Sequence, residues 1–222
     1  MRTIMAVGVS ALAAVSLAGC RAPPGIKGLS SRSTAVASAA TATARPTPPS
    51  LLPPDVLTVL RRYTLAQSDL PTGYSAGGLL EVPNDQAAND YADAQVAKQE
   101  MSDTGRQGGL GQQLTGPPSI AGTLGVSIEL FKDAAGAQRW ASQPPASSPA
   151  LQMTPEPVDR PFGDASSAMH WSQGGQSGYV LSFSQGRIVY GLGIQAPAGQ
   201  ESLVPLEVLA QSLEQKAKQQ SN

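Results

Sequence analysis

The sequence predicts an α+β domain, an antiparallel sheet with flanking helices, preceded by an export signal and a disordered tether. Three observations support this class. Residues 168–194 alternate apolar and polar side chains in runs separated by glycine-containing turns, which is typical of antiparallel hairpins. Residues 203–217 place leucines at helical spacing. Residues 21–54 instead contain few large apolar side chains and repeated Ala, Thr and Pro, so they cannot bury enough surface to fold.

The N-terminus has the organisation of an export signal. Arg2 supplies a positive start, and residues 4–17 carry no charge. That run is shorter than the ~20 apolar residues needed to span a bilayer. It ends in Leu17-Ala18-Gly19-Cys20, which resembles the lipobox of bacterial lipoproteins. The resemblance implies transfer of a diacylglyceryl group to the sulfur of Cys20 and cleavage between Gly19 and Cys20.

The resemblance also implies a location outside the cytoplasm, in the bacterial cell envelope, with the membrane as a partner through the lipid anchor. Two acyl chains on one cysteine give durable attachment, whereas one chain gives marginal binding. Cys20 is the only cysteine, so no disulfide supports the fold. We therefore divide the chain into a signal peptide (1–19), a lipidated cysteine with its tether (20–54) and one globular domain (55–222). The choice between inner and outer membrane stays open.

The charge balance excludes some partners. Only 14% of the residues are charged and the formal net charge is −1. No basic patch is present, so a nucleic-acid partner is not expected. No cofactor motif is found either, because the glycines at 108, 109 and 111 neither follow a strong strand nor precede a Lys-Ser or Lys-Thr pair.

The first half of the domain mixes helices and strands. The pattern predicts a helix over 55–63, a strand over 74–82, a single helix from Asn84 or Asp85 to Met101, and a strand over 124–130. Asp133 is expected to cap a short helix that carries Trp140. The glycines of 105–116 allow at most a ragged strand, and 144–161 reads as a loop with a short strand near 151–153.

The second half centres on two hairpins. Gln185-Gly186 is predicted to be a two-residue turn that pairs Phe183 with Ile188, Leu181 with Tyr190, and Tyr179 with Leu192 on one core face. The chain closes with a helix, capped by Ser202, that buries Leu206, Leu209 and Leu213 and turns Glu214 to water.

The preceding hairpin has two alternative registers at Gly174-Gly175. A two-residue turn would put His170 on the core face and Trp171 outside, whereas a three-residue loop (174–176) would bury Trp171 and Met169. Burial of apolar surface favours the three-residue loop. His170, Ser172, Ser182 and Gly191 then share the opposite face, which is low in relief. That face is either packed by a helix or simply exposed to water, which we favour, or it is a binding face for a ligand or partner.

The chemistry of the chain is restricted by its single histidine. A Ser-His-Asp triad would have to use His170 with residues near it in sequence, and the Gly-x-Ser-x-Gly elbow is missing. The neighbours available to such a triad are Asp164, Ser166, Ser172 and Ser177. One histidine without thiols does not predict a metal site. We therefore predict a non-catalytic domain that binds an unknown protein or small molecule, with the layout of a sensor or accessory lipoprotein. The alternative is an envelope hydrolase that uses His170.

Overall fold

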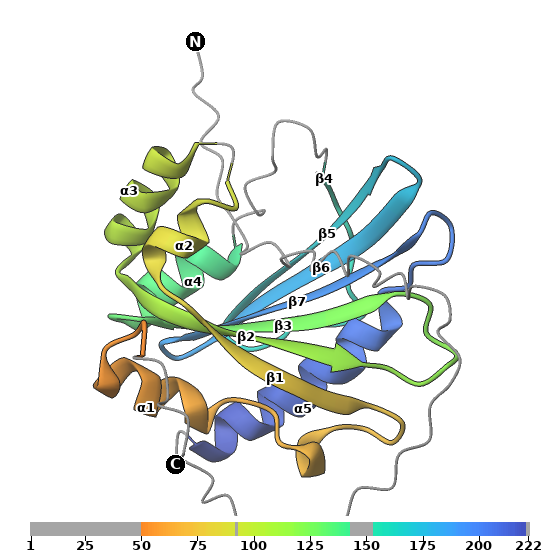
Figure 1. Ribbon diagram of the computed structural model, residues 1–222, viewed down its shortest axis with the longest axis horizontal. Coiled ribbons are helices and arrows are strands. Elements are labelled where there is room, and N and C mark those ends of the chain that lie inside the picture. The colour runs from red at the N-terminus through yellow and green to blue at the C-terminus, as the bar shows by residue number, and fades with distance from the viewer. Residues whose placement is uncertain (1–49, 92, 143–152, 221–222) are drawn as a thin grey trace, which may run out of the picture. The chain divides into compact units, whose positions relative to one another are not determined.

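The computed structural model describes residues 50–91, 93–142 and 153–220. The predicted signal peptide, its cleavage site and Cys20 lie outside these residues. One seven-stranded antiparallel sheet runs through the domain in the order β1-β2-β3-β7-β6-β5-β4, with helices on both sides (Figure 1). The elements are α1 (Pro54–Arg62), η1 (Gln67–Asp69), β1 (Ser75–Val82), α2 (Asn84–Ala88), α3 (Ala94–Thr104), β2 (Arg106–Thr115), β3 (Thr123–Phe131), α4 (Ala134–Ser142), β4 (Met153–Pro155), β5 (Ala165–Gln173), β6 (Gln176–Gln185), β7 (Ile188–Pro197) and α5 (Val204–Gln220).

Each face of the sheet has its own core. On the first, here called the α5 face, α1 and α5 cover large apolar side chains of β2, β3, β6 and β7. On the second, here called the α4 face, α2, α3 and α4 form a smaller, alanine-rich core with Phe131 and Val189. The predicted α+β class is confirmed, and the sheet is covered on both sides.

The two halves of the sheet meet along one seam, where β3 pairs with β7 from Thr123–Gln195 to Leu130–Ile188. The predicted alternation over 124–130 is confirmed, since Leu124, Val126, Ile128 and Leu130 are all buried on the α5 face. The predicted helix at 55–63 and the predicted strand at 74–82 are also present. Asp133 caps α4 as expected, because its Oδ1 accepts from the Gly136 amide at 2.8 Å.

The single helix predicted from residue 84 to Met101 is wrong, because the chain forms two helices there. The Asp93 carboxylate accepts from the amides of Gln95 and Val96 and starts α3 afresh. The ragged strand predicted within 105–116 is in fact the regular strand β2. Short helices and glycine-rich strands both show weak hydrophobic periodicity. The sequence pattern therefore predicted neither the break between α2 and α3 nor the regular strand β2.

The register of the β6–β7 hairpin differs from the prediction. The turn is Gly186-Arg187, so Phe183 pairs with Tyr190 and Leu181 with Leu192. Gly186 has φ of 56°, which suits the first central position of a type II′ turn. The shift moves the pairing by two residues. Because side chains alternate with a period of two, the predicted core face still holds.

The register predicted at Gly174-Gly175 is wrong. Both glycines have positive φ, as a two-residue type I′ turn requires, and His170 pairs with Tyr179. His170 therefore lies on the α5 face and Trp171 on the α4 face. The prediction assumed that only one face of the sheet buries apolar side chains. Both faces are covered by helices, so Met169 is buried on the α4 face without the predicted register. Trp171 lies against Gly178, where an added Cβ would stand 2.9 Å from the indole nitrogen.

The folded domain begins before the predicted boundary at residue 55. Leu52 is buried, and a Cβ on Gly108 would stand 2.6 Å from its Cδ2. At the other end, α5 buries Leu206, Leu209 and Leu213 as predicted. Glu214 is buried rather than exposed, because it pairs with Arg160 at 2.9 Å and accepts from the Gly163 amide. The predicted strand near 151–153 corresponds to β4 from Met153 onward, and residues 151 and 152 lie outside the described ones.

Candidate functional site

The four residues predicted to share a binding face are divided between two faces. His170 and Ser172 lie on the α5 face, whereas Ser182 and Gly191 lie opposite each other on the α4 face. The prediction of a common face is therefore wrong, and the cause is the register of the β5–β6 hairpin.

Ser182 and Gly191 lie in a part of the sheet that α4 packs against. Ser182 is only 2% exposed. Next to it on β5, the Ser167 hydroxyl donates to the Ala141 carbonyl of α4 at 2.7 Å. Small side chains here let the helix approach the strands closely. The packed-face alternative is therefore the one this geometry favours for these two residues.

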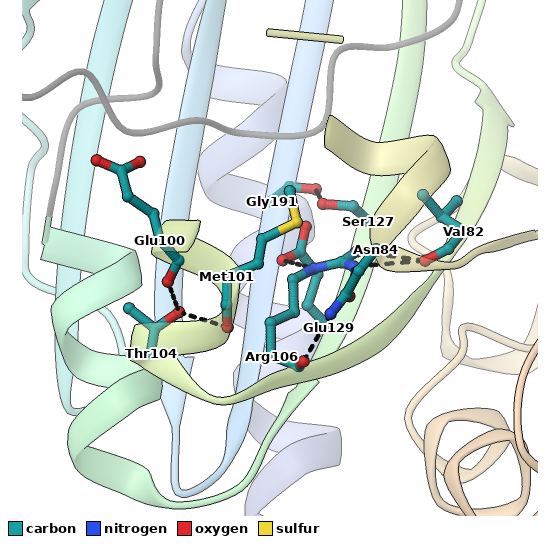
Figure 2. A network of polar contacts seen from close by, with 9 residues as sticks. All are labelled: Val82, Asn84, Glu100, Met101, Thr104, Arg106, Ser127, Glu129 and Gly191. Carbon is teal, nitrogen blue, oxygen red and sulfur yellow. Dashed lines mark hydrogen bonds and ion pairs between the residues drawn. The ribbon is translucent and has the colours of Figure 1, made fainter. Parts of the chain in front are cut away.

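A buried ion pair lies on the same α4 face. Arg106 Nε donates to Glu129 Oε2 at 2.9 Å, and the two side chains are 0% and 2% exposed. Arg106 Nη1 also donates to Asn84 Oδ1 at 2.6 Å, and the Asn84 amide donates back to the Arg106 carbonyl (Figure 2). Gly109 makes room for the guanidinium, because a Cβ there would stand 2.7 Å from Nη2. This network fixes β2, β3 and the start of α2 to one another.

Two further polar groups are buried beside this network. Within the described part of the chain, the Tyr91 hydroxyl and both carboxylate oxygens of Glu100 have no hydrogen-bond partner. Burial raises the pKa of Glu100, and the nearby Asp103 carboxylate raises it further. Figure 2 shows the Glu100 carboxylate pointing away from Arg106. Because the ion pair presents no exposed surface to a ligand, we assign the Arg106 network a structural role.

Replacing Arg106 with Met should destabilise the domain by about 3–5 kcal/mol, because it leaves the Glu129 carboxylate buried without its cation. Adding Glu129→Leu to that variant should recover most of the loss, since an apolar pair avoids the cost of burying charges. Urea unfolding of the single and double variants measures both effects. A double variant as unstable as Arg106→Met would contradict this account.

A second polar cluster lies at the other end of the sheet, on the α5 face. His170 Nε2 lies 3.1 Å from Glu201 Oε1, and the His170 ring packs on Tyr179 with ring centroids 4.8 Å apart. Glu201 belongs to residues 198–203, here called the strap, which connect β7 to α5. The Gly199 amide donates to Glu201 Oε2 at 2.7 Å, and the Ala198 amide donates to the Gly175 carbonyl. The strap is thus held to the sheet at Ala198 through the Gly175 carbonyl and at Glu201 through His170.

The Glu201 carboxyl has a low pKa, about 2, against an ordinary value of 4.5. The Ser177 hydroxyl makes the largest contribution, followed by the backbone amide of Glu201, the His170 side chain and the Gly199 amide. The Ser177 hydroxyl forms no hydrogen bond with the carboxylate, so it acts on Glu201 as a nearby dipole. Glu201 is therefore ionised throughout the physiological range.

The serines and the aspartate considered for a triad are mostly elsewhere. Asp164 accepts from the Gly186 amide at the opposite end of β6, and the Ser166 hydroxyl accepts from the Phe162 amide. Ser177 does approach the cluster, but it is only 1% exposed and its neighbour is the Glu201 carboxylate. A serine nucleophile needs the imidazole as its base. Here the carboxylate takes that place, so Asp164, Ser166 and Ser177 do not form a triad with His170.

The low pKa of Glu201 predicts a pH dependence. Because the folded-state pKa lies below the unfolded one, the stabilisation is complete above about pH 4.5 and is lost as the pH falls towards about 2. Glu201→Gln should reduce the melting temperature at pH 7 and flatten its fall over that acid window. Thermal melts of both proteins across the pH range provide the test, and parallel curves would contradict it.

An open hollow of about 200 Å³ lies on the other side of the strap, at the start of α5. Its walls come from the β2–β3 connection, β7, the strap and the first turn of α5, and none of its lining residues is charged. Three polar side chains stand around an apolar surface: the lining residues are Ser119, Ile120, Ala121, Ile194, Gln200, Ser202, Val204 and Pro205. No local sequence pattern predicts this site, because residues 119–121 lie more than 70 residues before the other lining residues, which all fall within 194–205.

Neither metal binding nor membrane crossing is supported by the described residues. Within residues 50–91, 93–142 and 153–220, no group of three or more His, Asp or Glu side chains gathers around a point where a metal could bind. In the same ranges no helix combines the length and the apolar character that a membrane span needs.

Comparison with known proteins gives a weak structural likeness. No family model matches the sequence, and no curated protein matches it. Among solved structures, the extracellular domain of PknH from Mycobacterium tuberculosis is similar with a TM-score of 0.48 and 11% sequence identity. The alignment covers 73% of this chain and 96% of that domain. A likeness of this size assigns neither a family nor an activity to this chain.

Proposed function

We propose that this chain is a lipid-anchored protein of the bacterial cell envelope, outside the cytoplasm, whose domain binds a ligand or partner without catalysing a reaction. The lipobox-like Leu17-Ala18-Gly19-Cys20 and the tether support the location. The hollow at the start of α5 supports the binding role, because it is a concave surface lined by apolar side chains together with three polar ones, a combination common in binding sites.

The character of the hollow limits what it would bind. Its volume of about 200 Å³ is smaller than the roughly 300–1,000 Å³ of drug-sized sites. None of its lining side chains is charged, so a charged ligand group would lose its hydration there without gaining an opposite charge. Pro205 also removes one of the backbone donors that the first turn of α5 could offer to an anion. We therefore propose a small uncharged ligand, or one uncharged side chain of a partner protein.

An envelope hydrolase that uses His170 is the second candidate. The contact between His170 and Glu201 favours it, since a carboxylate commonly orients a catalytic imidazole. The arrangement of the side chains weighs against it, because the Ser177 hydroxyl lies next to the Glu201 carboxylate and not next to the imidazole. Any hydrolytic activity that survives His170→Ala would exclude this mechanism.

The proposed anchor predicts the behaviour of Cys20→Ala. In the producing bacterium, the wild-type chain should fractionate with membranes and carry the mass of a diacylglyceryl group on a chain that starts at Cys20. Cys20→Ala should lose both the lipid mass and the cleavage at that site, because the acceptor sulfur is missing. Ser31→Ala in the tether is the matched control and should behave as wild type. Unchanged mass and fractionation of Cys20→Ala would contradict the anchor.

The proposed site predicts the behaviour of Ala121→Trp, which fills the hollow at a half-buried position on its wall. If the ligand is a small molecule, native mass spectrometry of the full-length protein in detergent should detect it. If the partner is a protein, crosslinking in the native envelope should capture it. Ala121→Trp should abolish the association with little change in melting temperature. Ala135→Trp, on the exposed side of α4, is the control and should retain it. Association that Ala121→Trp leaves intact would locate the site elsewhere.

A further inference from the structure

Exposed leucines gather at the first edge of the sheet. Leu79 and Leu80 of β1 are 46% and 51% exposed, and Leu51, in the segment before α1, is 61% exposed. β1 is an outer strand, paired on one side only (Figure 1). Leu79 and Leu80 point to opposite faces of the strand, so the edge itself is apolar on both sides.

Leu51 is held next to that edge by Glu81 of β1. Glu81 Oε2 accepts from the Leu51 amide at 2.7 Å, the Leu52 amide at 3.1 Å and the Ser50 hydroxyl at 2.8 Å. Leu52 turns inward and is buried, while its neighbour Leu51 faces outward. The exposure of Leu51 is therefore fixed by the fold.

Two exposed cations at the end of α1 favour an anionic surface. Arg61 and Arg62 are both exposed at the end of α1, and the Arg61 charge acts on Glu81. The acidic groups here are Glu81, whose carboxylate is occupied by the donors of residues 50–52, and Asp55 at the start of α1. The two arginines thus remain available to a partner.

The chain outside the described residues joins the domain at the same place. The described part begins at Ser50, whose hydroxyl contacts Glu81 of β1. Twenty-nine residues lie between Cys20 and Ser50. A disordered coil of that length, which the sequence predicts here, spans about 30 Å and gives a tethered surface an effective concentration on the order of mM. Even weak docking of this edge would then be populated.

We propose that the β1 edge rests on the lipid surface that holds Cys20, with Leu51, Leu79 and Leu80 entering the interface and the two arginines facing anionic headgroups. The proposal rests on the lipid anchor proposed above. A partner strand fits this edge less well, because the register of β1 shifts between Ala76 and Leu79, which interrupts the row of backbone donors and acceptors. A lipid surface accepts side chains from both faces of the edge.

The test uses the full-length lipidated protein and an environment-sensitive fluorophore on an introduced cysteine. Gly78→Cys places the label on the edge, where an added Cβ meets nothing within 4 Å. Gln173→Cys, exposed at the end of β5, is the control position. In phosphatidylcholine vesicles with phosphatidylglycerol, emission from residue 78 should shift to the blue and rise several-fold, while emission from residue 173 should not change. Label on the wild-type chain would reveal a free Cys20 and overturn the anchor.

Two variants separate docking from anchoring. Leu79→Glu with Leu80→Glu should abolish the blue shift while the protein still floats with vesicles, and both positions are exposed enough to leave folding intact. Arg61→Glu with Arg62→Glu should weaken the shift only when phosphatidylglycerol is present.

Flotation with equal emission from both labelled positions would overturn the docking and spare the anchor. A blue shift that grows with protein concentration without vesicles would assign the edge to a second copy of the chain. Failure to float would overturn both proposals.

Discussion

The pairing of β3 with β7 holds the two halves of this domain together. It joins β1-β2-β3 to β7-β6-β5-β4 along a single seam between segments that lie more than 50 residues apart in sequence. Leu124, Val126 and Ile128 from one half meet Ile194, Leu192 and Tyr190 from the other, and these pairs form the centre of the α5-face core. Closing so long a loop costs entropy before any contact forms, so we expect seam formation to limit the rate of folding.

The two polar clusters depend on that seam in different ways. Glu129 lies within it on β3, and its ion pair with Arg106 is fully enclosed by the α4-face core. Such a pair contributes less to net stability than to fixing one arrangement of β2, β3 and α2. His170 and Glu201 lie at the opposite end of the sheet from Arg106 and are partly exposed, so solvent screening reduces the contribution of their contact to stability. Their role is to position the strap that separates them from the hollow.

The proposed role combines a lipid attachment with a fixed surface. The hollow draws on the β2–β3 connection, β7 and the strap, all of which converge at one end of the sheet. The leucine-bearing edge lies where the tether joins. If that edge rests on the membrane, the tether would supply local concentration and the edge would give the domain, and with it the hollow, one orientation relative to the membrane. Neither feature depends on a catalytic group.

The sequence by itself determined the α+β class, the helix and strand positions with clear periodicity, and the core face of the β6–β7 hairpin. These follow from local alternation, which a chain displays whatever its neighbours are. Only the tertiary structure decided the position of His170, since both hairpin registers bury apolar groups once α4 covers the second face. It alone brought Glu201 to His170 and Arg106 to Glu129, because those contacts join distant segments and leave no local pattern. Lipid attachment at Cys20 remains a prediction of the sequence motif.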